Sequence, residues 1–255
     1  MRVTVVGCSG SFPGPDSPAS CYLVEAEDAA GRTWRVLLDL GSGALGALQR
    51  HVDPLDVDGV FLTHLHADHC LDLCGYYVLR RYHPSGPRPR IPVHGPRGTA
   101  DRLARAYDLA PEVGMLGEFD FREYAESAAA VTLGPFTVDP VRVCHPGEAF
   151  ALRVRAAGRT LLYTGDSGPC AALDEHAAGA DLLLAEASFR VGRDNPPDLH
   201  LTGRDAAELA TRAAVGRLLL THVPPWHDPA DALAEARPGY AGPLSLAEPG
   251  ATYPV

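Results

Sequence analysis

The sequence predicts an α/β fold in which two β-sheets pack face to face and helices cover their outer faces. Short apolar runs typical of buried strands dominate the first quarter of the chain, and helical patterns follow them. The second half repeats this order of strands and then helices. Because each element must bury its apolar face against another, two strand-rich halves with trailing helices favour a layered arrangement.

The first half of the chain begins with strands and continues into helices. Runs of aliphatic residues predict strands at 3–7, 21–25, 34–39, 60–62 and 91–94. A turn-rich stretch at 10–18 separates the first two of these strands. Helical periodicity predicts helices at 70–82 and 98–107.

The second half follows the same pattern without an internal repeat or a low-complexity linker. We expect strands at 137–143, 149–154, 159–163, 181–185 and 217–221. A helix is expected after Pro169, and another at 204–215, where Thr202 and Asp205 resemble a capping box. The absence of a linker predicts that residues 1–255 form one domain.

Composition limits the kind of protein this is. Hydrophobic residues make up 46% of the 255, yet no stretch approaches the ~18 apolar residues of a membrane span. The first residues enter a strand directly and lack an apolar targeting segment, so we expect a soluble, cytoplasmic protein. A net charge of -10 opposes diffuse binding to nucleic acid. The six cysteines form no Cys-x-x-Cys pair, which favours reduced thiols.

Four strong metal ligands crowd into six positions directly after the strand at 60–62: His64, His66, Asp68 and His69. A loop at the carboxyl end of a strand is where α/β folds place chemistry. Imidazole and carboxylate groups packed together without a cation would repel or desolvate one another. The pattern therefore predicts that His64 and His66 point to one metal ion and that Asp68 and His69 point to a second. The alternative is a polar surface turn.

Three more polar residues stand just beyond expected strands: His145, Asp166 and His222. Each of them alone is more often a hydrogen-bonded structural residue. Together with the first cluster they provide enough nitrogen and oxygen ligands for two metal ions, each with three or four protein ligands and an open position.

This ordered set, with Asp39 ahead of it, resembles the metallo-β-lactamase superfamily over almost the whole chain. The resemblance implies an αββα sandwich of two mixed sheets with helices outside. It implies that one metal is held by His64, His66 and His145, that the other is held by Asp68, His69 and His222, and that Asp166 bridges them. Asp39 matches a buried aspartate that braces the ligand loop. Oxygen-reducing members carry Glu at the position of His66, so this histidine favours hydrolysis.

Within the superfamily, the chain is similar to the tRNase Z-like phosphodiesterases. The similar segments are 163–167, 185–189, 200–202 and 221–225. The resemblance implies that His200 faces the scissile phosphate rather than a metal and that Glu186 orients it. The alternative for His200 is an exposed residue at the start of a helix.

The resemblance thus implies a dinuclear metal-dependent phosphodiester hydrolase. A bound metal lowers the pKa of water to roughly 7 and so provides a nucleophile for attack on phosphorus. We expect His200 to protonate the departing ribose oxygen and Asp68 to share the proton handling at the nucleophile. The nitrogen and oxygen ligands suit zinc, which we expect, with manganese or iron as alternatives.

Spacing favours a small substrate over tRNA. His145 and Asp166 are only 21 positions apart, which leaves no room for the tRNA-binding arm that tRNA-maturing relatives carry there. Phosphoribosyl cyclic phosphate phosphodiesterases carry a cysteine-rich zinc site that Cys8 and Cys21 alone do not reproduce. We therefore expect a 3',5'-cyclic nucleotide such as cyclic AMP as substrate. The alternatives are tRNA 3'-end processing, with a homodimer partner gripping the RNA, and a non-catalytic metal-binding protein.

Other polar segments are less specific. The segment 7–11 follows a strand and is expected to be a tight turn rather than a phosphate-binding loop. The arginines between Arg80 and Arg90 suggest either a solvated loop or a lid that contacts phosphate. Trp226 and His227 follow closely on His222 and could line a pocket for the base.

Overall fold

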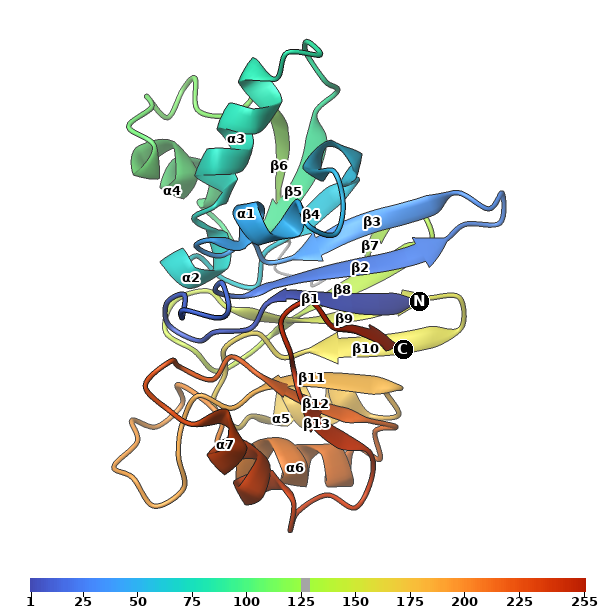
Figure 1. The fold of residues 1–255 in the computed structure, drawn as a ribbon, viewed down its shortest axis with the longest axis vertical. Coiled ribbons are helices and arrows are strands. Elements are labelled where there is room, and N and C mark those ends of the chain that lie inside the picture. Colours follow the sequence, from blue (N-terminus) through green and yellow to red (C-terminus); the bar gives the residue numbers. More distant parts are fainter. Residues whose placement is uncertain (125–128) are drawn as a thin grey trace.

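Two seven-stranded sheets face each other in the computed structural model, which describes residues 1–124 and 129–255 (Figure 1). The first sheet has the order β14-β1-β2-β3-β4-β5-β6. Its strands are β1 (Arg2–Gly7), β2 (Cys21–Glu27), β3 (Thr33–Leu38), β4 (Gly59–Phe61), β5 (Ile91–Gly95), β6 (Phe119–Glu123) and β14 (Thr252–Pro254).

The second sheet has the order β13-β12-β11-β10-β9-β8-β7. Its strands are β7 (Val131–Leu133), β8 (Phe136–Arg142), β9 (Phe150–Ala156), β10 (Arg159–Tyr163), β11 (Leu182–Glu186), β12 (Leu218–Thr221) and β13 (Leu244–Leu246). Both sheets are mixed, because antiparallel strands pair at one side and parallel strands at the other. The αββα sandwich expected from the sequence is confirmed.

Helices cover the outer face of each sheet (Figure 1). On the first sheet lie α1 (Ala44–Leu48), α2 (Ala67–Cys70), α3 (Leu73–Tyr82) and α4 (Thr99–Ala106). On the second lie α5 (Ala171–Ala177), α6 (Gly203–Arg212) and α7 (Pro229–Ala236). A further helical segment is a 3-10 turn, η1 (Pro54–Asp56). None of the helices in the described ranges is long and apolar enough to cross a membrane.

Strand β2 shows how the sequence produces these layers. Tyr22 and Val24 point into the core between the two sheets, whereas Cys21 and Leu23 point into the core beneath the helices. Successive side chains of a strand alternate between faces, so a strand buried on both faces is a continuous apolar run. The central strands of both sheets were predictable for this reason.

One helix that the sequence predicts as continuous is interrupted in the structure. The helix expected at 70–82 is split into α2 and α3, with a break at Leu71 and Asp72. At the break the Asp72 N–H donates to the Leu40 carbonyl, and the Asp72 carboxylate accepts from the Leu45 N–H at 2.8 Å. These contacts tie the break between α2 and α3 to α1 and to the loop after β3. By contrast, the capping box of Thr202 and Asp205 at the start of α6 is confirmed.

Parallel strands carry the site at one edge of the sandwich. In the first sheet β3, β4, β5 and β6 are parallel, and in the second sheet β10, β11, β12 and β13 are parallel. The loops that follow the carboxyl ends of parallel strands are where open α/β sheets bind ligands.

Gly41, on the loop after β3, presses directly against the backbone of Asp68. A Cβ atom at Gly41 would lie 1.9 Å from the Asp68 carbonyl oxygen. We expect Gly41→Ala to lower the free energy of unfolding by about 1–3 kcal/mol, as overpacking does, and to lower metal affinity by displacing Asp68. Urea unfolding of metal-free protein and metal titration measure the two effects.

Gly46 offers the matched control. It lies in α1, and a Cβ atom at this position would have nothing within 4 Å, so Gly46→Ala should stabilise the protein by up to about 1 kcal/mol. Equal effects of the two substitutions would contradict a steric role for Gly41.

Candidate metal centre

The seven predicted ligands converge on one place from separate segments of both sheets. His64 and His66 lie on the loop between β4 and α2, and the next two ligands belong to α2 itself. The others, His145, Asp166 and His222, stand on the loops after β8, β10 and β12. The structure thus brings together every residue that the sequence analysis proposed as a ligand.

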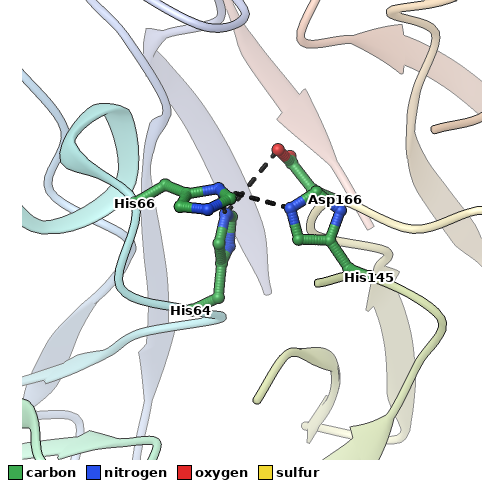
Figure 2. Close-up of side chains that lie close together, drawn as sticks. All are labelled: His64, His66, His145 and Asp166. Carbon is green, nitrogen blue, oxygen red and sulfur yellow. Dashed lines mark hydrogen bonds and ion pairs between the residues drawn. The ribbon is translucent and has the colours of Figure 1, made fainter. Parts of the chain in front are cut away.

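The first group consists of His64, His66, His145 and Asp166 (Figure 2). His66 Nδ1 lies 3.0 Å from His64 Nε2 and 3.3 Å from His145 Nε2. His64 Nε2 is 3.7 Å from Asp166 Oδ2. One ligand atom from each residue lies within 4.8 Å of all the others, so a single cation could be bound by all four.

The second group consists of Asp68, His69, Asp166 and His222. His222 Nε2 is 3.1 Å from both His69 Nε2 and Asp68 Oδ2. His69 Nε2 is 3.2 Å from Asp166 Oδ1. Asp166 belongs to both groups, as a bridging ligand must.

The donor set fits a pair of cations. Asp166 Oδ1 is buried and accepts no hydrogen bond from the described residues. The nitrogens of His69 and His222 face each other directly. Buried polar atoms without partners are costly, and a cation between them would satisfy the lone pairs of all these atoms at once.

A second layer of contacts orients the imidazole rings. In four of the ligand histidines the Nδ1 atom points away from the centre and has a hydrogen-bond partner. His69 Nδ1 lies 2.7 Å from Asp39 Oδ2, and His145 Nδ1 lies 2.8 Å from the Leu199 carbonyl. His222 Nδ1 lies 2.8 Å from Ser188 Oγ, and His64 Nδ1 lies 3.1 Å from Thr63 Oγ1. Such partners fix the ring and leave the inner nitrogen as the ligand atom.

Asp39 has the bracing position that the resemblance implies. Its side chain is fully buried and accepts hydrogen bonds from the Thr63 N–H at 2.7 Å and the Tyr163 hydroxyl at 2.9 Å. Asp39 itself has a left-handed backbone with φ 59°. The contacts join β3, β4 and β10, and therefore both sheets, beneath the ligands.

Sequence reasoning missed the roles of Thr63, Ser188 and Tyr163. Ser188 donates its hydroxyl hydrogen to the His222 carbonyl at 2.8 Å and accepts from His222 Nδ1. All three residues fall next to a predicted ligand or inside a segment that is similar to the tRNase Z-like phosphodiesterases. Their type and position gave no signal of which ring they would contact, because those contacts bridge separate strands.

His200 is held beside the metal groups by Glu186. His200 Nδ1 lies 2.9 Å from Glu186 Oε1 and 3.9 Å from Asp166 Oδ2. Glu186 is fully buried and also accepts from the Ser167 N–H at 2.7 Å. With a side chain only 13% exposed, His200 is not the exposed helix-cap residue of the alternative interpretation.

Electrostatics of the centre follow from its burial. Burial disfavours the imidazolium of His200, but the charge and hydrogen bond of Glu186, with help from Asp166, raise its pKa to about 9. Burial opposes ionisation of Asp166, yet the surrounding histidines hold the pKa of its carboxyl well below its usual range. Burial and neighbouring imidazoles hold the pKa of His64 well below its usual range. A neutral His64 and an ionised Asp166 are the forms that bind metal.

The arginines at 80–90 lie away from this centre. They lead from the end of α3 to the start of β5, and Arg80, Arg88 and Arg90 line a cavity of about 690 Å³ with residues at the amino end of β3, the opposite end from Asp39. Arg80 is buried and donates to the carbonyls of Glu118 and Pro89. These positions do not support a lid over the metal ligands.

All six cysteines are free thiols, as expected. No cysteine belongs to a candidate metal group among the residues that the structure describes. Trp226 and His227 do not line the same pocket. His227 lines a cavity of about 270 Å³ between the loop at 14–17 and the loop at 246–249, whereas Trp226 is not among the residues that line this cavity.

This fold and ligand arrangement define a metallo-β-lactamase-type protein, and the chain belongs to that superfamily. The sequence model of a family described as "Beta-lactamase superfamily domain" matches residues 34–223. The chain is 46% identical to protein Rv1339 of Mycobacterium tuberculosis over 260 residues, covering 100% of this chain and 92% of the relative.

Two further relatives carry names that describe an activity. The chain is 28% identical to the probable metallo-hydrolase YhfI of Bacillus subtilis over 255 residues, or 98% of each chain. The crystal structure of YhfI superposes with a TM-score of 0.87 at 26% identity, covering 99% of both chains. The Ribonuclease Z of Myxococcus xanthus is 29% identical over 306 residues, covering 99% of this chain and 97% of the relative.

Proposed function

We propose that this protein is a dinuclear metal-dependent phosphodiester hydrolase that acts on a small cyclic nucleotide such as 3',5'-cyclic AMP. The observation that carries the proposal is the arrangement of two ligand groups that share Asp166, with His200 held beside Asp166 by a buried Glu186. Two cations that activate water and stabilise charge on the phosphoryl oxygens, with a proton donor for the leaving group, form a combination suited to cleavage of a phosphodiester.

The residues have distinct roles in this proposal. The ligand groups would hold two divalent cations, with zinc expected and manganese or iron as alternatives. Such cations act as Lewis acids on a phosphoryl oxygen and lower the pKa of bound water. Because His200 Nδ1 is paired with Glu186, its Nε2 is the nitrogen available to protonate the departing ribose oxygen. Asp68, which contacts His222, would take part in the proton handling at the nucleophile.

The connection between β9 and β10 supports a small substrate. These two strands fill most of the segment between His145 and Asp166 and form a hairpin whose turn is Ala157 and Gly158, both at positive φ. A hairpin this tight holds no arm. The alignment with the Ribonuclease Z of Myxococcus xanthus spans 306 positions against 255 residues here, so about fifty positions have no counterpart in this chain.

Processing of tRNA 3' ends is the second candidate, and the similarity to Ribonuclease Z favours it. In that case a homodimer partner would grip the RNA. A non-catalytic metal-binding role is a third alternative. The cytoplasmic location and the single domain at 1–255 remain predictions from the sequence.

A substrate panel on protein of defined metal content tests the proposal. Cyclic AMP, bis(p-nitrophenyl) phosphate and a precursor tRNA would be assayed side by side, with metal content measured on the same sample. We expect turnover of cyclic AMP that stops with a chelator and returns with added zinc or manganese. Preference for the precursor tRNA would favour the second candidate, and inert protein with fewer than two bound metals would favour the third.

A further inference from the structure

We infer that Phe12 and Trp226 form a stacking platform for the base of a nucleotide substrate, at the edge of the metal centre. This inference rests on the proposed function and adds the subsite that would select a nucleotide over other phosphodiesters. The two rings pack together with centroids 5.1 Å apart and an interplanar angle of 43°. Phe12 nevertheless stays 43% exposed and Trp226 62% exposed.

The platform is joined to the metal centre through the chain. The strand-like pairing of Ser9 with Val223 places the loop after β1 beside the loop after β12. Gly10 lies so close to His222 that a Cβ atom there would be 2.3 Å from the His222 carbonyl and 3.0 Å from its Nδ1. Phe12 follows Gly10 by two residues, which limits their separation to about 7 Å.

Trp226 follows His222 by four residues on the other loop. The His227 N–H donates to the Pro224 carbonyl, so the chain makes a turn at 224–227 directly after His222 and does not extend away from it. The ribose of a nucleotide separates its base from its phosphate. A nucleotide whose phosphate lies at the metal groups would therefore place its base at the two loops that carry Phe12 and Trp226.

Both loops are stiff, which lowers the cost of binding. Prolines fix their backbone at Pro13, Pro15, Pro18, Pro224 and Pro225. Gly14 packs against the ring of Pro225, at 3.2 Å from a Cβ placed on it, and so locks one loop to the other. Rings already fixed in place lose little freedom when a ligand stacks on them, and stacking tolerates any base because every base has a π-face.

Large exposed apolar side chains elsewhere in the described ranges lie on or near α3 and α4, remote in sequence from both loops.

The rings of Phe12 and Trp226 are too close together to hold a base between them. The base would therefore stack on the exposed face of Trp226, while Phe12 supports the Trp226 ring from the other side. His227, by contrast, faces the separate 270 Å³ cavity.

Kinetics with matched substrates test the platform. Trp226→Ala should raise KM for cyclic AMP by about fivefold to a hundredfold, the range expected for one lost base stack, with kcat within about twofold. The cyclic phosphate of methyl riboside, which has no base, should be turned over equally by both proteins. Trp226→Phe should restore most of the affinity. Tyr82→Ala, at an aromatic side chain of similar exposure on α3, is the control.

Fluorescence provides a readout that needs no turnover. The chain has two tryptophans, so a Trp34→Phe variant reports on Trp226 alone. AMP should quench this emission and ribose 5-phosphate should not. If Trp34→Phe fails to fold, the difference between the wild type and Trp226→Phe gives the same signal.

Failure of this inference is separable from failure of the proposed function. An active enzyme whose KM for cyclic AMP is unchanged by Trp226→Ala would overturn the platform and leave the hydrolase intact. Quenching by AMP in a protein that hydrolyses no cyclic nucleotide would support the platform while the proposed substrate is abandoned. A change from dimer to monomer in Trp226→Ala, with unchanged KM, would show instead that the rings bind a second copy of the chain.

Discussion

Replacing Asp166 by alanine is expected to abolish phosphodiester turnover and to lower the amount of bound metal. Asp166 is the one residue shared by both ligand groups, and its Oδ1 is buried without a hydrogen bond from the described residues. Changing residues that only orient metal ligands already costs about 10- to 100-fold, so loss of a bridging ligand should cost about a thousandfold or more. Metal analysis and kcat/KM with cyclic AMP measure both effects.

Asp101→Ala is the matched control for this substitution. Asp101 lies on α4 with its side chain 57% exposed, and its contact with Arg105 is a surface pair of little energetic weight. The control should keep the wild-type metal content and activity. An Asp166→Ala protein that retains two metal ions and full turnover would refute the bridging assignment.

Replacing His200 by alanine should slow cyclic AMP hydrolysis about 10²- to 10⁴-fold while metal content stays unchanged. The reason is geometric, because Glu186 holds His200 Nδ1 at 2.9 Å and His200 belongs to neither of the two ligand groups that share Asp166. The loss should appear in kcat more than in KM, since proton donation acts in the transition state.

Substrate choice separates proton donation from a structural role. Bis(p-nitrophenyl) phosphate releases a stable phenolate that needs no proton, so His200→Ala should slow its hydrolysis far less than that of cyclic AMP. Glu186→Gln keeps a hydrogen-bonding group but removes the charge beside His200, and should give a smaller loss with the same dependence on the leaving group. Equal losses for both substrates would show that His200 acts through the structure instead. His83→Ala, at a partly exposed residue after α3, is the control.

Much of the site was predictable because its residues are ordered along strand ends. The motif from His64 to His69 follows β4 directly, and His222 follows β12 in the same way. A strand of continuous apolar residues, followed by a polar ligand type, identifies both the strand and the end that carries chemistry. Glu186 and His200, which the resemblance pairs, lie 2.9 Å apart in the structure.

Several elements could not be predicted from local sequence. Strands β13 and β14 have three residues each and are no more than partly buried, so they show no periodic pattern. The split between α2 and α3 depends on the contact of Asp72 with Leu40, which is 32 positions earlier in the chain. The residues of β13 and β14, and those at the break between α2 and α3, therefore do not by themselves determine these structures.

Local sequence was enough to predict the layered fold, the identity of the candidate ligands and the short connection between His145 and Asp166. These follow from apolar periodicity, from ligand types and from chain length, and none of them needs a long-range contact. Tertiary structure was needed to decide which atoms face one another: that Asp166 joins both groups, that Ser188 orients His222, and that Phe12 meets Trp226. Such pairings join separate strands and loops, either across the two sheets or between neighbouring strands of one sheet, so their distances are set only when the chain is folded.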